Sequence, residues 1–177
     1  MNVDPDGFLR DHSVIALQDA NLRAVHGHYW IKKYETLEAD RICFLRHPIE
    51  RAVSHYFWWL SQPLSGNSLH RLVVERQLSF EAFAEIPAIR YFYTRHYFRC
   101  VDMKSFAFIG RSERYQEELE RLEGLLGCSG AKVSANPNSF EGYAERKAHI
   151  LDDPDCMQRL RDLFREDIGF YDLHAGR

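Results

Sequence analysis

The stretch from Arg41 to Ser54 constrains the fold more than any other part of the chain, because a strand and a helix meet in it without a linker. Residues 41–46 form an apolar run that ends on Arg46, a pattern typical of a strand buried on both faces of a parallel sheet. Pro48 follows, and a helix tolerates proline at its first position because the missing N–H would have no partner there. The stretch therefore predicts a β-strand that leads directly into an α-helix.

The helix that begins at Pro48 is predicted to be amphipathic. Apolar residues recur three and four positions apart along it, at Ile49, Ala52, Val53, Tyr56, Phe57 and Leu60. Arg51 and Ser54 lie one turn apart on a different face.

Similar patterns predict the remaining elements. We expect a short strand over 22–25, two or three helices over 68–100 and a second buried strand over 106–109, closed by Gly110. We also expect a helix capped by Ser112 and ended by Gly127, and a late helix opened by Asp153 and Pro154. Alternating strands and helices predict the α/β class. With 177 residues, of which 45% are hydrophobic, the chain can form one domain over 1–177.

Composition excludes several classes of protein. The net charge of −3 argues against a dedicated nucleic-acid binder, and no apolar run approaches the length of a membrane span. The four cysteines are scattered without a Cys-x-x-Cys pair, which argues against a zinc ribbon. Sparse cysteine and the lack of a recognisable signal peptide favour a cytoplasmic location.

Arg46 is the residue that introduces chemistry. Ligands of open α/β sheets bind outside the carboxyl ends of the strands, where Arg46 is expected. Arg46, Arg51 and Ser54, together with the N–H groups at the helix start, could form a site for a phosphate-like anion. The alternative is an ordinary helix start with solvated arginines.

The segment from Arg46 to Ser54 resembles the nucleotide-binding segment of sulfotransferases that use 3′-phosphoadenosine 5′-phosphosulfate (PAPS). The resemblance is closest to the carbohydrate group of heparan sulfate 2-O-sulfotransferases, whose pattern is Arg-x-Pro-x-x-Arg-x-x-Ser-x-Tyr. This chain matches it at Arg46, Pro48, Arg51, Ser54 and Tyr56 and departs from it at His47, where Asp or Asn is usual. The resemblance implies that Arg46 and Ser54 hold the 3′-phosphate of PAPS, in a P-loop-NTPase-like parallel sheet flanked by helices.

Other segments resemble the same family in the same order. His26-Gly27-His28 is similar to a His-Gly-His in which a histidine, here His26 or His28, would be the general base. Asn138 and Ser139 resemble the loop that closes over the nucleotide, and residues 108–113 and 167–171 resemble two later family segments. The implied reaction moves a sulfuryl group from PAPS to a hydroxyl of a carbohydrate-like acceptor, and no metal is required.

One part of the family pattern is absent from the sequence. No segment matches the Pro-Lys-x-Gly-Thr-[Ser/Thr] loop that binds the 5′-phosphosulfate, so we expect the chain to lack the first strand and phosphate loop. Three explanations stay open. The chain is a fragment or begins at a late start codon, or it is an inactive paralogue that still binds nucleotide or a partner. In the third explanation Arg111 or Lys33 supplies the positive charge of the lysine in the absent loop.

A metal site is a further alternative for the histidines. His26 and His28 are two positions apart, and on a strand such residues point the same way. No nearby cysteine or carboxylate completes a ligand set at a recognisable spacing, so the sequence predicts no metal.

Overall fold

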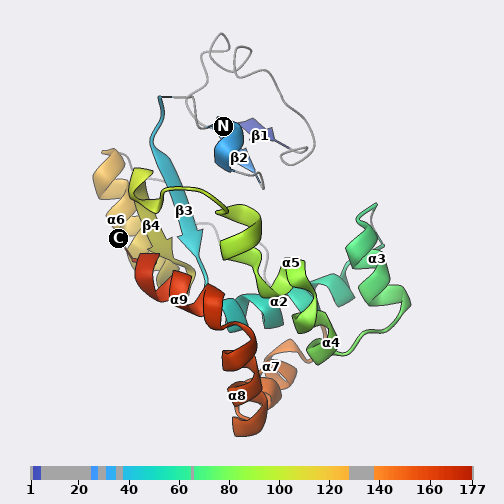
Figure 1. Cartoon of the computed structure of the whole chain (residues 1–177). Helices are drawn as coiled ribbons and strands as arrows, with labels where there is room; N and C mark the ends of the chain where they lie inside the picture. The colour runs from blue at the N-terminus through green and yellow to red at the C-terminus, as the bar shows by residue number, and fades with distance from the viewer. Residues whose placement is uncertain are drawn as a thin grey trace.

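The computed structural model describes residues 2–4, 25–27, 31–34, 38–64, 66–127 and 138–176. They form an α/β structure, as predicted, and helices make up most of it (Figure 1). One small parallel sheet joins β1 (Asn2–Asp4) to β2 (Val25–Gly27), and another joins β3 (Arg41–Leu45) to β4 (Phe106–Arg111). Of the short strand predicted over 22–25, residues 22–24 lie outside the described residues.

The β3–β4 pair confirms the parallel pairing but not the burial predicted for β3. Leu45 is 1% exposed, whereas Ile42 is 37% exposed. Within the described part of the chain β3 pairs with β4 alone, so the other edge of β3 has no strand partner there. Gly110 sits opposite Phe44 in the register, and a Cβ there would come within 2.6 Å of the Phe44 ring, so this close approach requires glycine.

Helix α2 (Pro48–Ser61) follows β3 after two residues and has Pro48 in its first turn. Its predicted apolar face is confirmed: Ile49, Ala52, Val53 and Phe57 are all buried. In Figure 1, α2 runs crosswise below the carboxyl end of β3.

The other described helical segments connect and flank these strands. They are η1 (Ile31–Tyr34), α3 (Ser68–Glu75), α4 (Phe80–Glu85), α5 (Pro87–Arg90), the π-helix η2 (Phe92–Tyr97), η3 (Met103–Ser105), η4 (Ser112–Arg114), α6 (Tyr115–Leu126), α7 (Tyr143–Leu151), α8 (Pro154–Leu163) and α9 (Arg165–His174).

The predicted helix ends are confirmed in two of three cases. Gly127 ends α6 with a φ of 62°, the left-handed conformation that favours glycine. Asp153 caps α8 by accepting hydrogen bonds from the N–H groups of Asp155 and Cys156. The prediction that Ser112 caps α6 is wrong, because Ser112 begins the 3-10 turn η4 and Arg114 takes the N-cap position.

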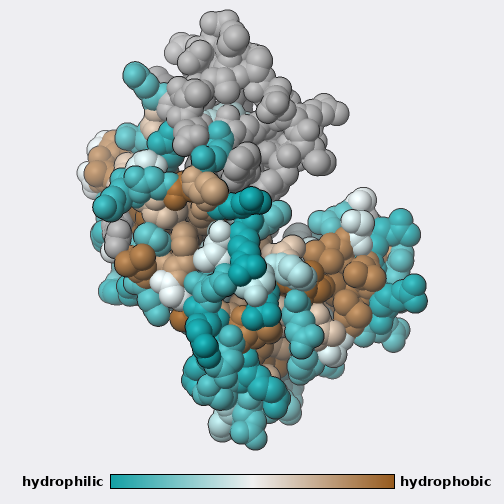
Figure 2. Space-filling model, in the orientation of Figure 1, coloured by the Kyte–Doolittle hydropathy of each residue, from teal (hydrophilic) through white to brown (hydrophobic). Residues whose placement is uncertain are grey.

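Two hydrophobic cores hold the described elements together. The first lies between α2, α4 and α8 and includes Phe57, Phe83 and Phe164. The second lies between the β3–β4 sheet, η2 and α9 and includes Leu45 and Tyr93. On the face drawn in Figure 2, α8 is mostly hydrophilic, whereas hydrophobic side chains gather around α3 and α4.

The carboxylate of Asp167 joins α9 to η2. It is fully buried and accepts hydrogen bonds from the backbone N–H groups of Tyr93 and Thr94 and from the Thr94 hydroxyl. A buried carboxylate is tolerated because these three donors replace its water shell. Through this contact α9 fixes the position of η2 and therefore of Tyr93.

Candidate functional site

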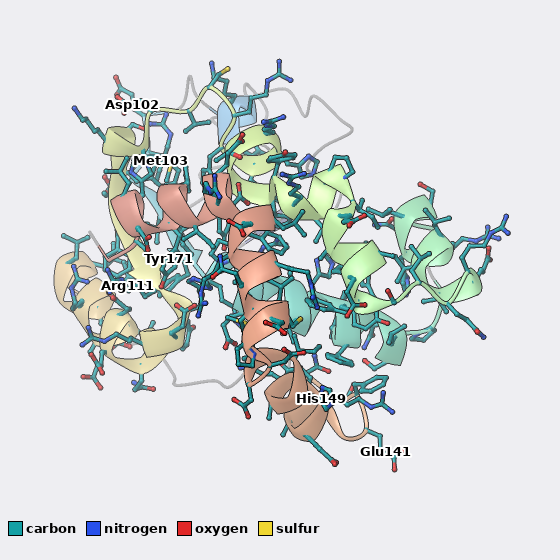
Figure 3. All side chains as sticks on the ribbon, turned by 60° about the horizontal axis from the view of Figure 1, so that its bottom comes forward. Asp102, Met103, Arg111, Glu141, His149 and Tyr171 are labelled. Carbon is teal, nitrogen blue, oxygen red and sulfur yellow. The ribbon has the colours of Figure 1, made fainter. Side chains whose placement is uncertain are left out.

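The carboxyl ends of β3 and β4 meet at one edge of the sheet because the strands are parallel. His47, after β3, and Glu113, after β4, are joined there: the His47 N–H donates to Glu113 Oε1 at 2.5 Å. Glu113 Oε2 accepts from the Tyr171 hydroxyl at 2.9 Å. Figure 3 shows Tyr171 of α9 beside Arg111 of β4. A carboxylate therefore already lies at the start of α2, where the helix dipole favours negative charge.

Arg46 is held through its backbone, which leaves its side chain exposed. The Tyr93 hydroxyl donates to the Arg46 carbonyl oxygen at 2.7 Å and accepts from the Arg46 N–H at 2.9 Å. The side chain, 36% exposed, turns along α2, and its guanidinium lies 3.7 Å from the Glu50 carboxylate. Arg46 is thus placed at the sheet edge, with a cationic group that a ligand can reach.

Asn138 and Ser139, the two residues assigned to a nucleotide loop by resemblance, lie beside α2. The Asn138 Nδ2 donates to the Ser54 carbonyl oxygen at 2.9 Å, and the Ser139 hydroxyl is 3.3 Å from the Ser61 hydroxyl. Asn138 Oδ1 accepts from the N–H of Phe140, which orients the amide. The structure therefore brings together Ser54 and Asn138, which are 84 positions apart in the sequence.

Lys147 of α7 joins this group and was not assigned a role from the sequence. Its Nζ lies 2.5 Å from Glu50 Oε2, the oxygen that also faces Arg46. No local pattern marks Lys147, because its approach to α2 depends on how α7 packs. Arg46, Glu50, Ser54, Asn138 and Lys147 form the candidate site, which we call the α2 strip.

Arg51 faces the interior instead of the α2 strip. It is 9% exposed, its Nη2 donates to the Ile89 carbonyl oxygen at 2.6 Å, and its guanidinium lies 3.9 Å from the centre of the Phe92 ring. Among the described residues no acceptor bonds to its Nε or Nη1, both of which are buried. Burial lowers the pKa of Arg51, and the nearby Tyr93 and Asp167 oppose that effect.

Arg51 therefore does not join Arg46 in the way that the spacing predicted. Helix α5 and η2 cover this side of α2, and a cation stacked on aromatic rings there supports packing.

The two candidate bases are described only in part. The backbone of His26 lies in β2, paired with Val3, and His28 lies outside the described residues. Neither assignment is tested by this structure. Within the described ranges no cluster of three His, Cys, Asp or Glu side chains could hold a metal ion.

Arg111 and Lys33 are the two residues that could replace the lysine of the absent phosphate loop. Arg111 donates from Nε and Nη2 to the Ala175 carbonyl oxygen, so its guanidinium holds the end of α9. The side chain of Lys33 lies outside the described part of the chain.

Two other groups near the sheet are neutral at physiological pH. Burial, followed by the hydrogen bond to Glu113, raises the pKa of the Tyr171 hydroxyl to about 12. Burial also raises the pKa of the Cys43 thiol to about 12, so Cys43 is not a thiolate nucleophile. Neither group carries the positive charge that an anionic ligand needs, whereas Arg46 and Lys147 of the α2 strip do.

Comparison of the chain with protein-family models, with curated proteins and with solved structures gave no match. None of the helices in the described ranges has the length and apolarity needed to cross a membrane.

Proposed function

We propose that this chain binds the 3′-phosphate of PAPS on the α2 strip and belongs to a sulfotransferase with a P-loop-NTPase-like sheet. The observation that carries the proposal is the contact of Asn138 with Ser54 of α2, the helix along which the Arg46 side chain turns toward Glu50. The resemblance assigned Arg46, Ser54 and Asn138 to one nucleotide site, and Asn138 comes from a segment far from the other two in the sequence. A shared resemblance and a shared location support each other, because neither was derived from the other.

The chemistry of the α2 strip suits a phosphate monoester. Two cations, Arg46 and Lys147, flank a partly exposed surface, and the Asn138 amide ties the loop segment to α2. An arginine fork, a lysine and a serine hydroxyl are common phosphate-binding groups.

The proposed reaction is an in-line displacement at sulfur. The oxygen of an acceptor hydroxyl, on a carbohydrate or a similar molecule, bonds to sulfur while the bond from sulfur to the bridging phosphate oxygen breaks. His26 or His28 takes the hydroxyl proton, and the products are a sulfate ester and adenosine 3′,5′-bisphosphate. A histidine suits this role because its ordinary pKa, about 6.5, leaves much of it neutral at physiological pH.

Calorimetric titration with adenosine 3′,5′-bisphosphate tests the binding step. We expect binding that weakens about tenfold or more in Arg46→Ala, because an arginine that bonds a charged ligand contributes strongly. Ser54→Ala and Asn138→Ala should weaken it less. Arg71→Ala is the matched control, since Arg71 forms an exposed pair with Glu75 on α3. No binding, or binding unchanged in Arg46→Ala, would refute the site.

Sulfate transfer from PAPS tests the reaction separately. If the chain transfers sulfate, His26→Ala or His28→Ala should abolish the transfer while leaving bisphosphate binding intact. Bisphosphate binding without any transfer would favour the second candidate, a catalytically inactive nucleotide-binding or interaction protein. That candidate follows from the lack of a Pro-Lys-x-Gly-Thr loop in the sequence.

A further inference from the structure

We infer that Lys147 binds the same phosphate as Arg46. We also infer that Glu50 is the counter-ion of both cations in the ligand-free protein, and that the phosphate displaces it when it binds. This inference rests on the proposed function, because it concerns the same α2 strip. It adds a residue from α7 and a means of competition, neither of which belongs to the motif that suggested the site.

The geometry shows one carboxylate shared between two cations. Glu50 Oε2 lies 3.7 Å from Arg46 Nη2 and 2.5 Å from Lys147 Nζ. Arg46 and Glu50 are four positions apart, whereas Lys147 reaches them from another helix. Glu50 thus occupies the space between the two cations that a ligand oxygen would need.

The charges indicate which ligand fits. Arg46, Lys147 and Glu50 together carry one net positive charge, so an arriving anion meets both attraction and a competing carboxylate. With Glu50 turned away, the two cations match a phosphate monoester, which carries close to two negative charges at neutral pH. A ligand without a terminal phosphate lacks the charge needed to replace Glu50.

The exposure of these side chains permits the exchange. The side chains of Arg46, Glu50 and Lys147 are 36%, 26% and 28% exposed. Glu50 can therefore rotate into water and keep its hydration, which a fully buried carboxylate could not do. Ion pairs that water reaches are weak, whereas charge-assisted bonds from arginine and lysine to phosphate are strong.

Calorimetric titration of three variants with adenosine 3′,5′-bisphosphate tests the inference. Removing the competing carboxylate in Glu50→Gln should tighten binding about three- to fivefold, the range that an exposed ion pair is worth. Removing the ammonium group in Lys147→Gln should weaken bisphosphate binding about tenfold. Lys147→Arg should restore most of the affinity, because it keeps the positive charge.

Matched controls separate the site from general electrostatics. Glu75→Gln and Arg71→Gln change the same charges in an exposed i,i+4 pair on α3, and neither should alter the affinity. Adenosine serves as the probe without a phosphate, and Glu50→Gln should leave its binding unchanged. Thermal unfolding of each variant checks that α7 still packs on α2.

The outcomes distinguish this inference from the proposed function. If the wild type binds and Arg46→Ala does not, while Glu50→Gln and Lys147→Gln bind like the wild type, the α2 strip stands and the inference is wrong. Weaker binding in Glu50→Gln would also overturn it, because Glu50 would then support the site. If the wild type itself does not bind the bisphosphate, both the function and the inference fail.

Discussion

The hydroxyl of Tyr93 holds both backbone groups of Arg46, since it donates to the carbonyl oxygen at 2.7 Å and accepts from the N–H at 2.9 Å. A side chain in η2 thus satisfies the backbone at the carboxyl end of β3, 47 positions earlier in the chain. The hydroxyl takes the place of a strand partner for Arg46. The direction in which the Arg46 guanidinium leaves the backbone therefore depends on Tyr93.

Tyr93→Phe should lower both stability and nucleotide affinity. The substitution leaves two backbone groups of Arg46 without their partner, and we expect it to cost about 2 kcal/mol of unfolding free energy. Urea denaturation measures that cost, and calorimetry with adenosine 3′,5′-bisphosphate measures the effect on Arg46. Tyr56→Phe is the control, because Tyr56 lies farther along α2 and its hydroxyl donates to the Leu78 carbonyl oxygen, away from Arg46. A loss of stability with unchanged affinity would show that Tyr93 does not position Arg46.

Arg51→Met should be tolerated, and Arg51→Ala should not. Methionine keeps most of the volume beside Phe92 and removes a buried charge that makes one hydrogen bond, so we expect stability within about 1 kcal/mol of the wild type. Alanine leaves a cavity and should cost about 2–4 kcal/mol. Both are measured by denaturant unfolding. A loss of bisphosphate affinity in a well-folded Arg51→Met variant would show that Arg51 contributes to binding after all.

Tyr171→Phe should reduce the loss of stability at alkaline pH. The folded pKa of about 12 lies above the ordinary value of 10.0, so the contribution of Tyr171 is complete below pH 10 and is lost as the pH rises through 12. At neutral pH the variant should lose about 1 kcal/mol, the worth of the bond to Glu113. Unfolding curves between pH 8 and about 12 measure the difference. Tyr115→Phe, on the surface of α6, is the matched control.

Asp153→Ala should destabilise α8 by removing its N-cap, with a fall in Tm of about 3 °C. Asp153→Asn should be close to the wild type at neutral pH, since asparagine caps helices well. The hydrogen bond from the Cys156 N–H lowers the pKa of Asp153, so its contribution is complete above pH 3.8 and is lost as the pH falls through the lower folded value.

The advantage of the wild type over the Asp153→Asn variant should therefore shrink on acidification, which thermal unfolding from pH 7 to about 2.5 would show. Asp152→Ala, one residue earlier, is the control. An equal Tm loss in both alanine variants would argue against a specific cap.

Local patterns in the sequence were sufficient for β3, α2 and the cap at Asp153. In each case neighbouring residues determine the outcome: an apolar run, a proline in the first turn, or a side chain that reaches the N–H groups two and three positions ahead. Ser112 failed as a cap because η4 intervenes before α6 begins. A helix start can shift by one turn without any change in the apolar pattern.

The α2 strip could be predicted only in part. The motif identified Arg46 and Ser54, and the order of motifs identified Asn138, but Lys147 has no local signal. The burial of Arg51 also depends on distant residues, because α5 and η2 cover the Arg51 side of α2, where the helix spacing predicted an anion site. Tertiary packing determines both the approach of Lys147 to α2 and the burial of Arg51, and the spacing of residues along one helix does not predict how helices pack.

The direct pairing of β3 with β4 has a consequence for the order of folding. Leu45 pairs with Arg111, 66 positions later, and closing a loop of that length in an unstructured chain costs about 4 kcal/mol of entropy. Helices α2 to α5 lie within that loop and can form from contacts between near neighbours. We expect them to form first and to bring the strands together. Substitutions within α2 would then slow refolding. Substitutions of residues that make the contacts of β3 with β4 would mainly speed unfolding.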